Sequence, residues 1–496
     1  MNEENGFSQI IESLASSNEW LLIHSSRNAF ALLRDEIELT FKRGRILCGF
    51  TDDKGFQSWR VAGYKIELEK LTLDLTRNFG RERTRIRLVP RVSASELSQA
   101  VELARLEKTN QFANLIVAQN PKSKLVRVAL NKENGRFAQI TFEDSNKNQT
   151  AALSDVAEHA TPENLLTTAI LWSVKLQNRQ KNPINIIWIL AETKLYKNLR
   201  KLHALLDVSW QSKILVKEIS RRAKTQTAEI TDAPPISFGN LWREKPPKIR
   251  TAENFDLSRT ASEIVRLAPE KIDVLFTKHG ETLRFYGLPF ARVRRVADTE
   301  KAWFGIECKR RILNEATRTE FFVLLENLEI YRRFDSPNKR NDFFRLAPEA
   351  WLEAVLQRNI KSLDGNLILS PIHNQFRAGG DKIDLLALRK DGRLIVVELK
   401  VAPDREMIFQ AVDYWRKIEL QRRSGNLRTA KIFGDLEIDD QPTLVYLVAP
   451  TLSFHYDFAF LSKTVSPQIE IYRFDLNENW REDLKVMKVE EMRNER

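Results

Sequence analysis

The most constraining feature of this chain is residues 383–400, in which two apolar strand patterns flank a tight turn. The turn residues 390–392 read Lys-Asp-Gly, which suits a three-residue hairpin loop whose glycine adopts the left-handed conformation. This loop sets Asp384 directly opposite Glu398 on one face of the hairpin, with their Cβ atoms about 5 Å apart. Lys400 comes two residues after Glu398 and shares that face, because side chains alternate along a strand.

The chemistry of these three side chains indicates a metal site. Away from the turn the strands are apolar, so two carboxylates and an amine meet on a mostly buried sheet. Burying two adjacent carboxylates is costly unless a cation neutralises them. A set of oxygen ligands with open positions suits Mg²⁺ or Mn²⁺. We therefore expect Asp384 and Glu398 to hold one of these cations, rather than to lie on a solvated hairpin that merely pairs acid with amine.

Four segments of the chain occur in an order that is typical of one nuclease family. They are residues 353–359 (Glu-Ala-Val-Leu-Gln-Arg-Asn), the hairpin with Asp384 and Glu398-Leu399-Lys400, Gln410 with Tyr414, and residues 447–450 (Leu-Val-Ala-Pro). Through these four segments, residues 346–476 resemble the PD-(D/E)XK nucleases and, within them, the NucS-type nuclease domain. The resemblance implies a restriction-endonuclease-like domain, in which a central mixed sheet is flanked by helices.

The resemblance also implies a role for each matching residue. Glu353 resembles the third acidic group of the metal shell, with Glu349, one helical turn earlier, as the alternative. Lys400 is expected to orient the attacking water and to stabilise charge that develops on the phosphate oxygens. Gln410 and Tyr414, four residues apart on one helix face, are expected to support the site, although ordinary surface and core-edge roles stay open for both. The implied metal ligands are Glu353, Asp384 and Glu398.

Upstream of this domain the sequence predicts further α+β structure. Short strand patterns dominate two segments, helical and strand patterns alternate in a third, and two Pro-Pro steps lie among charged residues in a fourth. We therefore expect a basic β-rich domain (1–93), an α/β domain (94–222), a linker (223–250), a β-rich domain with a helix (251–345) and the nuclease-like domain (346–496).

The α/β segment 94–222 also resembles the C-terminal domain. Its residues 125–143 form a hairpin pattern that can be set on residues 383–400, but with no acid pair at the corresponding positions. The residues aligned with Asp384, Glu398 and Lys400 are Val126, Thr141 and Glu143. We expect either a nuclease fold without catalytic acids, retained for packing or DNA contact, or an unrelated α/β domain with a similar hairpin. A duplication would also pair the segments 1–93 and 251–345.

The charge balance indicates a polyanionic partner. The net charge of +12 is spread among many acids rather than gathered on one amphipathic helix, which favours nucleic acid over a membrane surface. One arginine-rich segment would present alternate arginines on one face of a strand, suited to phosphate contacts. These residues are Arg81, Arg83, Arg85 and Arg87, and Arg292, Arg294 and Arg295 form a second such group. The alternative is a solvated face whose charge is offset by nearby acids such as Glu82.

Several classes of protein are excluded by residues that the chain lacks. Its two cysteines, Cys48 and Cys308, lie far apart, and its histidines show no metal-ligand spacing, which excludes a disulfide framework and a cysteine zinc site. The N-terminus has no apolar signal sequence and no apolar run could span a bilayer. We therefore expect a cytoplasmic protein with no membrane partner.

Together these features predict a Mg²⁺- or Mn²⁺-dependent endonuclease that hydrolyses DNA phosphodiester bonds, in DNA repair or in defence against foreign DNA. The alternative is a non-catalytic nucleic-acid-binding protein built on a nuclease-like fold. The loss of any one acid would have favoured that alternative, whereas Glu353, Asp384 and Glu398 are all present. The sequence leaves open whether RNA is also bound and whether the chain acts as a monomer or a homodimer.

Overall fold

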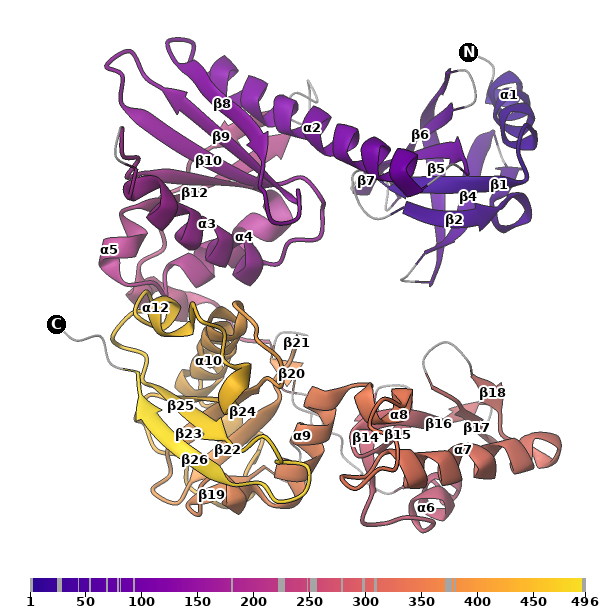
Figure 1. Ribbon diagram of the computed structural model, residues 1–496, viewed down its shortest axis with the longest axis vertical. Helices are drawn as coiled ribbons and strands as arrows, with labels where there is room; N and C mark the ends of the chain where they lie inside the picture. Colours follow the sequence, from indigo (N-terminus) through magenta and orange to yellow (C-terminus); the bar gives the residue numbers. More distant parts are fainter. Residues whose placement is uncertain are drawn as a thin grey trace. The chain divides into compact units, whose positions relative to one another are not determined.

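The computed structural model describes most of the chain, and its contacts divide the chain into two compact units. The described residues are 3–24, 29–42, 44–52, 55–67, 70–77, 80, 82–91, 94–179, 182–221, 228–247, 249, 257–277, 280–296, 299–306, 310–370, 377–378 and 381–492. One unit comprises Met1–Arg200 and Ser212–Pro234, and the other comprises Lys201–Gln211 and Pro235–Arg496. Each unit contains an antiparallel β domain and a mixed α/β domain, so the chain has the α+β fold class that its sequence predicts (Figure 1).

The first β domain is an antiparallel sheet of seven strands with helix α1 (Glu3–Ala15) packed on it. Its strand order is β2-β1-β7-β6-β5-β4-β3, so β1 pairs with β7 at the end of a meander. Alternate residues such as Leu71, Leu73 and Leu75 of β6 point into the core. The other elements are β1 (Glu19–His24), β2 (Ala29–Leu33), η1 (Arg34–Glu36), β3 (Glu38–Lys42), β4 (Arg45–Asp52), β5 (Gly55–Glu67), β6 (Lys70–Arg77) and β7 (Glu82–Pro90).

The first α/β domain is a six-stranded mixed sheet in the order β13-β12-β11-β10-β9-β8. β8, β9 and β10 are antiparallel, β10, β11 and β12 run parallel, and β13 returns antiparallel. The elements are α2 (Ala94–Gln119), β8 (Lys124–Leu130), β9 (Phe137–Glu143), β10 (Gln149–Asp155), α3 (Pro162–Gln177), β11 (Ile187–Glu192), α4 (Thr193–His203), β12 (Ile214–Arg221) and β13 (Ala228–Thr231). Because β13 lies inside the segment expected as a linker, this sheet extends beyond the expected boundary at residue 222.

The second β domain is an antiparallel meander of five strands, β14 to β18, in chain order. Residues of α6 and α7 pack with one face of the sheet in a single core. The elements are α6 (Arg259–Val265), β14 (Ile272–Thr277), β15 (Gly280–Phe285), β16 (Leu288–Val296), β17 (Thr299–Phe304), β18 (Arg311–Ile312), η4 (Glu315–Thr317), α7 (Arg318–Tyr331) and α8 (Asp342–Arg345). The first β domain contains a similar five-stranded meander, β3 to β7, but adds β1 and β2, so the expected pairing of the two β-rich segments stays a prediction.

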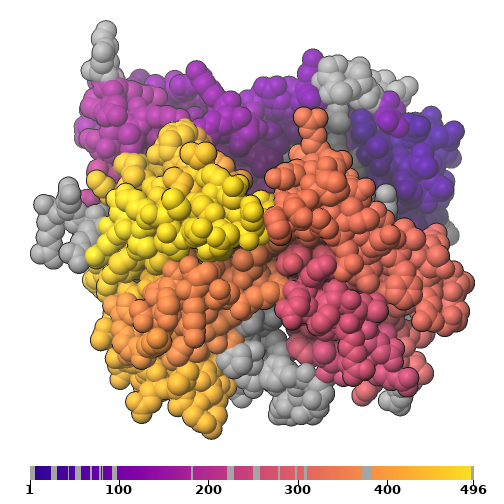
Figure 2. Space-filling model, turned by 60° about the horizontal axis from the view of Figure 1, so that its bottom comes forward, coloured from indigo at the N-terminus to yellow at the C-terminus, as the bar shows by residue number. Residues whose placement is uncertain are grey.

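The second α/β domain is a six-stranded mixed sheet in the order β19-β22-β23-β24-β25-β26. Its elements are α9 (Pro348–Arg358), η5 (Ile360–Ser362), β19 (Leu367–Leu369), β20 (Arg377–Ala378), β21 (Asp381–Lys382), β22 (Leu385–Arg389), β23 (Leu394–Leu399), α10 (Met407–Arg423), α11 (Asn426–Thr429), β24 (Leu444–Pro450), η7 (Thr451–Ser453), α12 (Phe458–Ser462), β25 (Ile471–Leu476) and β26 (Val486–Glu491). Helix α5 (Val208–Gln211) and η3 (Phe238–Arg243) belong to the same unit. The surfaces of this domain and of the second β domain lie side by side (Figure 2). Within the described residues no helix is long and apolar enough to cross a membrane.

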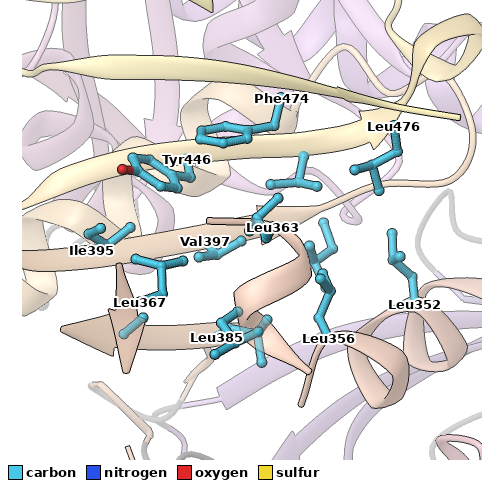
Figure 3. Packing of buried hydrophobic residues seen from close by; sticks show 14 of the residues in the cluster. Leu352, Leu356, Leu363, Leu367, Leu385, Ile395, Val397, Tyr446, Phe474 and Leu476 are labelled. Carbon is cyan, nitrogen blue, oxygen red and sulfur yellow. The ribbon is translucent and has the colours of Figure 1, made fainter. Parts of the chain in front are cut away.

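Alternation along β22 and β23 gives this sheet two different apolar faces. On one face, Leu352 and Leu356 of α9 point toward Val397 and its neighbours on the sheet (Figure 3). The opposite face packs against α10, whose Ile418 contacts Val396 and its neighbours. Side chains at even positions of β23 therefore point to the α10 face, and this is the face on which Glu398 lies.

The hairpin register expected from the sequence is confirmed. Leu385 pairs with Val397 and Leu388 with Leu394, which sets Asp384 opposite Glu398 just beyond the ladder. The Gly392 N–H donates to the Arg389 carbonyl over 2.8 Å, and the N–H of Arg389 donates to the carbonyl of Arg393 over the same distance. Gly392 has a φ of 86°, a left-handed conformation that glycine adopts without the steric penalty of a side chain.

The two mixed sheets share strand order and strand direction. In both, three antiparallel strands are followed by two parallel neighbours and a final antiparallel edge strand. The hairpin equivalence expected from the sequence is nevertheless wrong by one strand. β8 and β9 correspond to β19 and β22, whereas β9 and β10 correspond to the hairpin with Asp384 and Glu398. The turns alone do not identify the equivalent strands, because Gly-Arg follows the first strand of both hairpins. Strand order is instead set by the crossover helices α3 and α10.

Candidate metal centre

The hairpin brings Asp384, Glu398 and Lys400 together at the end of β23. The Lys400 ammonium donates to Oε1 of Glu398 over 2.8 Å, and both side chains are buried, with 8% and 2% of the residue exposed. Oδ2 of Asp384 accepts a hydrogen bond from the backbone N–H of Leu399 over 2.9 Å, which fixes that carboxylate beside the strand end. The other carboxylate oxygen of Glu398, Oε2, is buried and has no hydrogen-bond partner among the described residues. A buried carboxylate oxygen without a partner is a position at which a cation would be stabilised.

The electrostatics of Glu398 differ from those of the other buried carboxylates in this domain. Burial, followed by repulsion from Asp384, raises the pKa of Glu398 well above its ordinary value, and the attraction of Lys400 does not offset it. Burial also opposes ionisation of Asp413 and Glu419, yet Arg416 and Lys417 beside Asp413, and Arg422 with Thr443 beside Glu419, lower the pKa of each carboxyl. The positive charge near Glu398 is thus too small to offset its burial and the repulsion from Asp384, whereas Asp413 and Glu419 of α10 have enough basic or hydrogen-bonding partners.

Lys400 is held in its charged form by the acids around it. Burial alone would lower the pKa of the ammonium, but Glu398, Glu349 and Asp404 outweigh burial and raise that pKa above its ordinary value. Asp404 lies 3.7 Å from the ammonium nitrogen. Lys400 therefore stays a cation and a hydrogen-bond donor at neutral pH.

Gln410 and Tyr414 lie four residues apart on α10, on the face of the sheet that carries Glu398. The side-chain oxygen Oε1 of Gln410 is buried and has no hydrogen-bond partner among the described residues. Tyr414 packs at the edge of the core beneath α10, with the Lys417 ammonium 5.5 Å from its ring centroid. Gln410 therefore has an unused acceptor among the described residues, while Tyr414 has the contacts of a core-edge residue.

Glu353 and Glu349 both lie on α9 but have different surroundings. Glu353 is 3% exposed, accepts a hydrogen bond from Gln357 over 2.7 Å and lies 3.6 Å from the Arg284 guanidinium of β15. Its charge is thus compensated by the second β domain. Glu349, one turn earlier, is exposed and close enough to act electrostatically on both Glu398 and Lys400. The metal role of Glu353 stays a prediction, and the surroundings of the two residues favour Glu349.

Helix α9 is anchored by one buried arginine of α7's C-terminal end. The guanidinium of Arg332 donates to five backbone carbonyls and stacks 4.7 Å from the ring of Trp351. The acceptors are the carbonyls of Phe285, Tyr286, Phe343, Leu346 and Ala347. Ala347, the residue before the helix, has a φ of 44°, a conformation that is unfavourable for alanine. These contacts fix the start of α9, and with it Glu349, against the second β domain.

The donor set fits a hard divalent cation with few protein ligands. Two carboxylates face each other, and Oε2 of Glu398 and Oε1 of Gln410 lack partners among the described residues. Within that part of the chain no group of three or more His, Cys, Asp or Glu side chains is arranged to hold a metal ion. Mg²⁺ commonly binds through one or two carboxylates, with water and substrate phosphate completing its shell. A cavity of about 530 Å³ near α11, lined by residues 427–438, contains none of these groups.

The arginines expected to contact phosphate are mostly ion-paired. Arg83, Arg85 and Arg87 alternate on one face of β7, but Arg85 is bonded to Asp74 and Arg87 lies 3.6 Å from Glu107. Arg81 lies outside the described residues. The charge of Arg85 and Arg87 is therefore already offset by acids.

A second arginine group carries more uncompensated charge. Arg292 and Arg294 share one face of β16, opposite Trp303 and Lys301 of β17, while the other face holds the domain core. Burial, then repulsion from Arg310 and Arg294, lowers the pKa of Arg292. None of these three arginines forms a hydrogen bond or ion pair in the described parts of the chain. We call Arg292, Arg294, Arg310 and Trp303 the arginine patch; the sequence signals Arg292 and Arg294, whereas Arg310 is recognised only from its repulsion of Arg292.

Comparison with known proteins adds little to this geometry. No protein-family model matches the chain, and no curated protein sequence matches it. A solved structure of EndoMS in its apo form is 14% identical, covering 38% of this chain and 84% of that chain, with a TM-score of 0.14. A TM-score this low carries no argument about fold or function.

The raised pKa of Glu398 makes a prediction about stability. A carboxyl whose pKa is raised on folding stabilises the fold fully below its ordinary pKa, and this contribution is lost as pH rises through the raised pKa. The contribution of Glu398 should therefore fall as pH rises above about 4, so the free energy of unfolding of Glu398→Gln relative to that of the metal-free parent should increase over this range. Added Mn²⁺ should raise the melting temperature of the parent at pH 7.5, by an amount that grows with its concentration, but not that of the variant.

Asp413→Asn is the matched control for this measurement. The pKa of Asp413 is lowered by its basic partners, so its contribution has the opposite sign and the variant should be less stable than the parent at neutral pH. Both variants are compared by thermal unfolding from pH 4 to 9, with and without Mn²⁺. An equal response of parent and Glu398→Gln to pH and to Mn²⁺ would contradict the assignment of Glu398.

Proposed function

We propose that this protein is a divalent-metal-dependent nuclease that hydrolyses DNA phosphodiester bonds at the end of β23. The observation that carries the proposal is the pair of carboxylates, Asp384 and Glu398, beside a buried lysine, with one oxygen of Glu398 left without a partner among the described residues. The PD-(D/E)XK resemblance, which rests in part on these same residues, supports the same function through three further segments of the sequence.

In this proposal Asp384 and Glu398 would hold Mg²⁺ or Mn²⁺, and Glu349, rather than Glu353, would act on the site as a third negative charge. A bound divalent cation lowers the pKa of a coordinated water and stabilises charge on the phosphate oxygens. The Leu399 N–H holds the Asp384 carboxylate in one orientation, so the ligand is positioned before the cation arrives.

Lys400 has the second role in the proposed reaction. Its ammonium lies 2.8 Å from Glu398 and remains charged at neutral pH because three acids surround it. It is thus placed to orient a water beside the metal ligands and to stabilise negative charge on the attacked phosphate. Gln410 contributes a buried oxygen that can accept a hydrogen bond from the same water. Tyr414 acts through the packing of α10.

The arginine patch supports nucleic acid as the substrate. Three arginines repel one another on a sheet face that also presents Trp303, and phosphates would relieve this repulsion while bases stack on the ring. The same observation favours a second candidate function, a nucleic-acid-binding protein without catalysis. Substitution of the carboxylates distinguishes the two functions: it should abolish cleavage by a nuclease, whereas a protein that only binds nucleic acid has no cleavage to lose.

Substitution of the acids should separate cleavage from binding. Asp384→Asn and Glu398→Gln remove a metal ligand while keeping side-chain shape, so cleavage in Mn²⁺ should fall on the order of a hundredfold or more. DNA affinity should stay the same or increase, because a negative charge facing phosphate is removed. The assay is a cleavage time course on a panel of duplex, mismatched, branched and single-stranded DNA, beside a gel-shift titration.

Glu353→Gln and Glu349→Gln form a matched pair within this experiment. We expect Glu349→Gln to slow cleavage, and Glu353→Gln to lower stability through the loss of charge beside Arg284. Cleavage at the parental rate by Asp384→Asn and Glu398→Gln would reject the proposed site. If Glu353→Gln slows cleavage and Glu349→Gln does not, while the two variants are equally stable, Glu353 and not Glu349 acts on the metal site.

The arginine patch should control the salt dependence of DNA binding. Replacing Arg292 and Arg294 by Gln removes two uncompensated charges, so the slope of log affinity against log salt should become shallower by about 1.8. Arg85→Gln is the control, because Arg85 is already bonded to Asp74 and releases fewer counterions. Fluorescence anisotropy at several salt concentrations measures both slopes. A larger change for Arg85→Gln than for the double variant would show that β7, not the arginine patch, binds DNA.

A further inference from the structure

The mixed sheet of the first unit can be set on that of the second residue by residue. Ile187 of β11 pairs with Ile214, as Val445 of β24 pairs with Ile471, and β11 and β24 are each followed at once by a helix. The ladder to the preceding strand continues the match, because Ala151 pairs with Ile187 just as Val396 pairs with Val445. β10 therefore corresponds to β23 in register as well as in position.

This register identifies the counterparts of the three site residues. Leu153 lies two residues after Ala151, as Glu398 lies two residues after Val396, so an apolar side chain stands where the buried glutamate stands. Gln139 is paired with Leu153 across the hairpin and corresponds to Asp384. The counterpart of Lys400 is Asp155.

Leu153 and Asp155 cannot take over the roles proposed for Glu398 and Lys400. Leu153 is completely buried and has no ligand atom. Asp155 has acquired a structural role: its Oδ1 accepts the N–H of Ala157 over 2.8 Å, and its Oδ2 accepts the N–H of Ala160 over 2.9 Å. Both carboxylate oxygens thus hold the loop that leads to α3. The sheet retains its strand order with the acid pair absent.

From this comparison we infer that each chain carries one catalytic set, in the second α/β domain, and that a single copy of the chain therefore breaks one strand of duplex DNA per binding event. The inference rests on the proposed function and specifies its product, a nicked duplex. In each event one water is consumed: its oxygen forms a bond to phosphorus, one P–O ester bond breaks, and the leaving oxygen takes up a proton from solvent. The first α/β domain contributes a nuclease-like scaffold without a reaction centre.

The test is a time course on supercoiled plasmid in excess over the full-length protein, with Mn²⁺, at a protein concentration at which sedimentation shows single chains. Nicked circles should accumulate first, and linear DNA should appear only after most plasmids carry a nick, as independent nicks meet on opposite strands. Linear DNA that forms from the earliest time points at a rate similar to that of nicked circles would overturn the inference. Absence of any cleavage would instead reject the proposed function itself, so the two failures are distinguishable.

Two variants and a binding measurement locate the activity. Glu398→Gln should stop the cutting of both plasmid strands, whereas Asp155→Ala should leave the initial nicking rate within about twofold of the parent. Titration of each protein with Mn²⁺, followed by calorimetry, should give binding that Glu398→Gln abolishes and Asp155→Ala retains. Residual cutting by Glu398→Gln, or Mn²⁺ binding that Asp155→Ala removes, would show a second centre in the first unit and overturn the inference. Thermal unfolding of each variant verifies that it is folded.

Discussion

The structure of the second α/β domain depends on one electrostatic constraint, the placement of two carboxylates opposite each other on a buried hairpin. Repulsion from Asp384 and burial both oppose ionisation of Glu398, and one lysine does not compensate them. Structural acids elsewhere in the domain do not share this condition, because Asp413 and Glu419 have basic partners that lower their pKa. Uncompensated negative charge at a fixed position favours the binding of a divalent cation. The charge lowers the stability of the metal-free fold, and binding of the cation restores that stability.

The second β domain contributes to that site through α9. Arg332 binds five carbonyls around the start of the helix, and Arg284 compensates Glu353 one turn further on. Gly287, with a φ of 76°, approaches the helix so closely that a Cβ there would lie 2.0 Å from the Ala350 carbonyl oxygen. Glu349 is thereby presented to Glu398 and Lys400 by contacts made outside the α/β domain. The arginine patch lies on the same β domain, so the proposed DNA contacts and the proposed chemistry belong to one unit.

Local features of the site could be predicted from the sequence, whereas features that depend on packing between domains could not. The turn at residues 390–392 determines the register of its hairpin, and strand alternation then puts Lys400 beside Glu398. The choice between Glu349 and Glu353 depends on Arg284, which is 69 residues away along the chain from Glu353 (353 minus 284) and reaches it only through packing. The turns predict an equivalence of the two sheets that is wrong by one strand, because similar turns occur in both sheets. The order of the strands depends instead on the crossover connections.

The proposed site requires that Asp384 and Glu398 bind one divalent cation together. Diffraction from crystals of the full-length protein grown with Mn²⁺, with data collected at the manganese absorption edge, would locate that cation. We expect an anomalous peak within coordination distance of a carboxylate oxygen of both residues, and we expect it to disappear in crystals of Glu398→Gln. A peak located at other side chains, or none at these two carboxylates while Mn²⁺ is present at millimolar concentration, would contradict the proposed site.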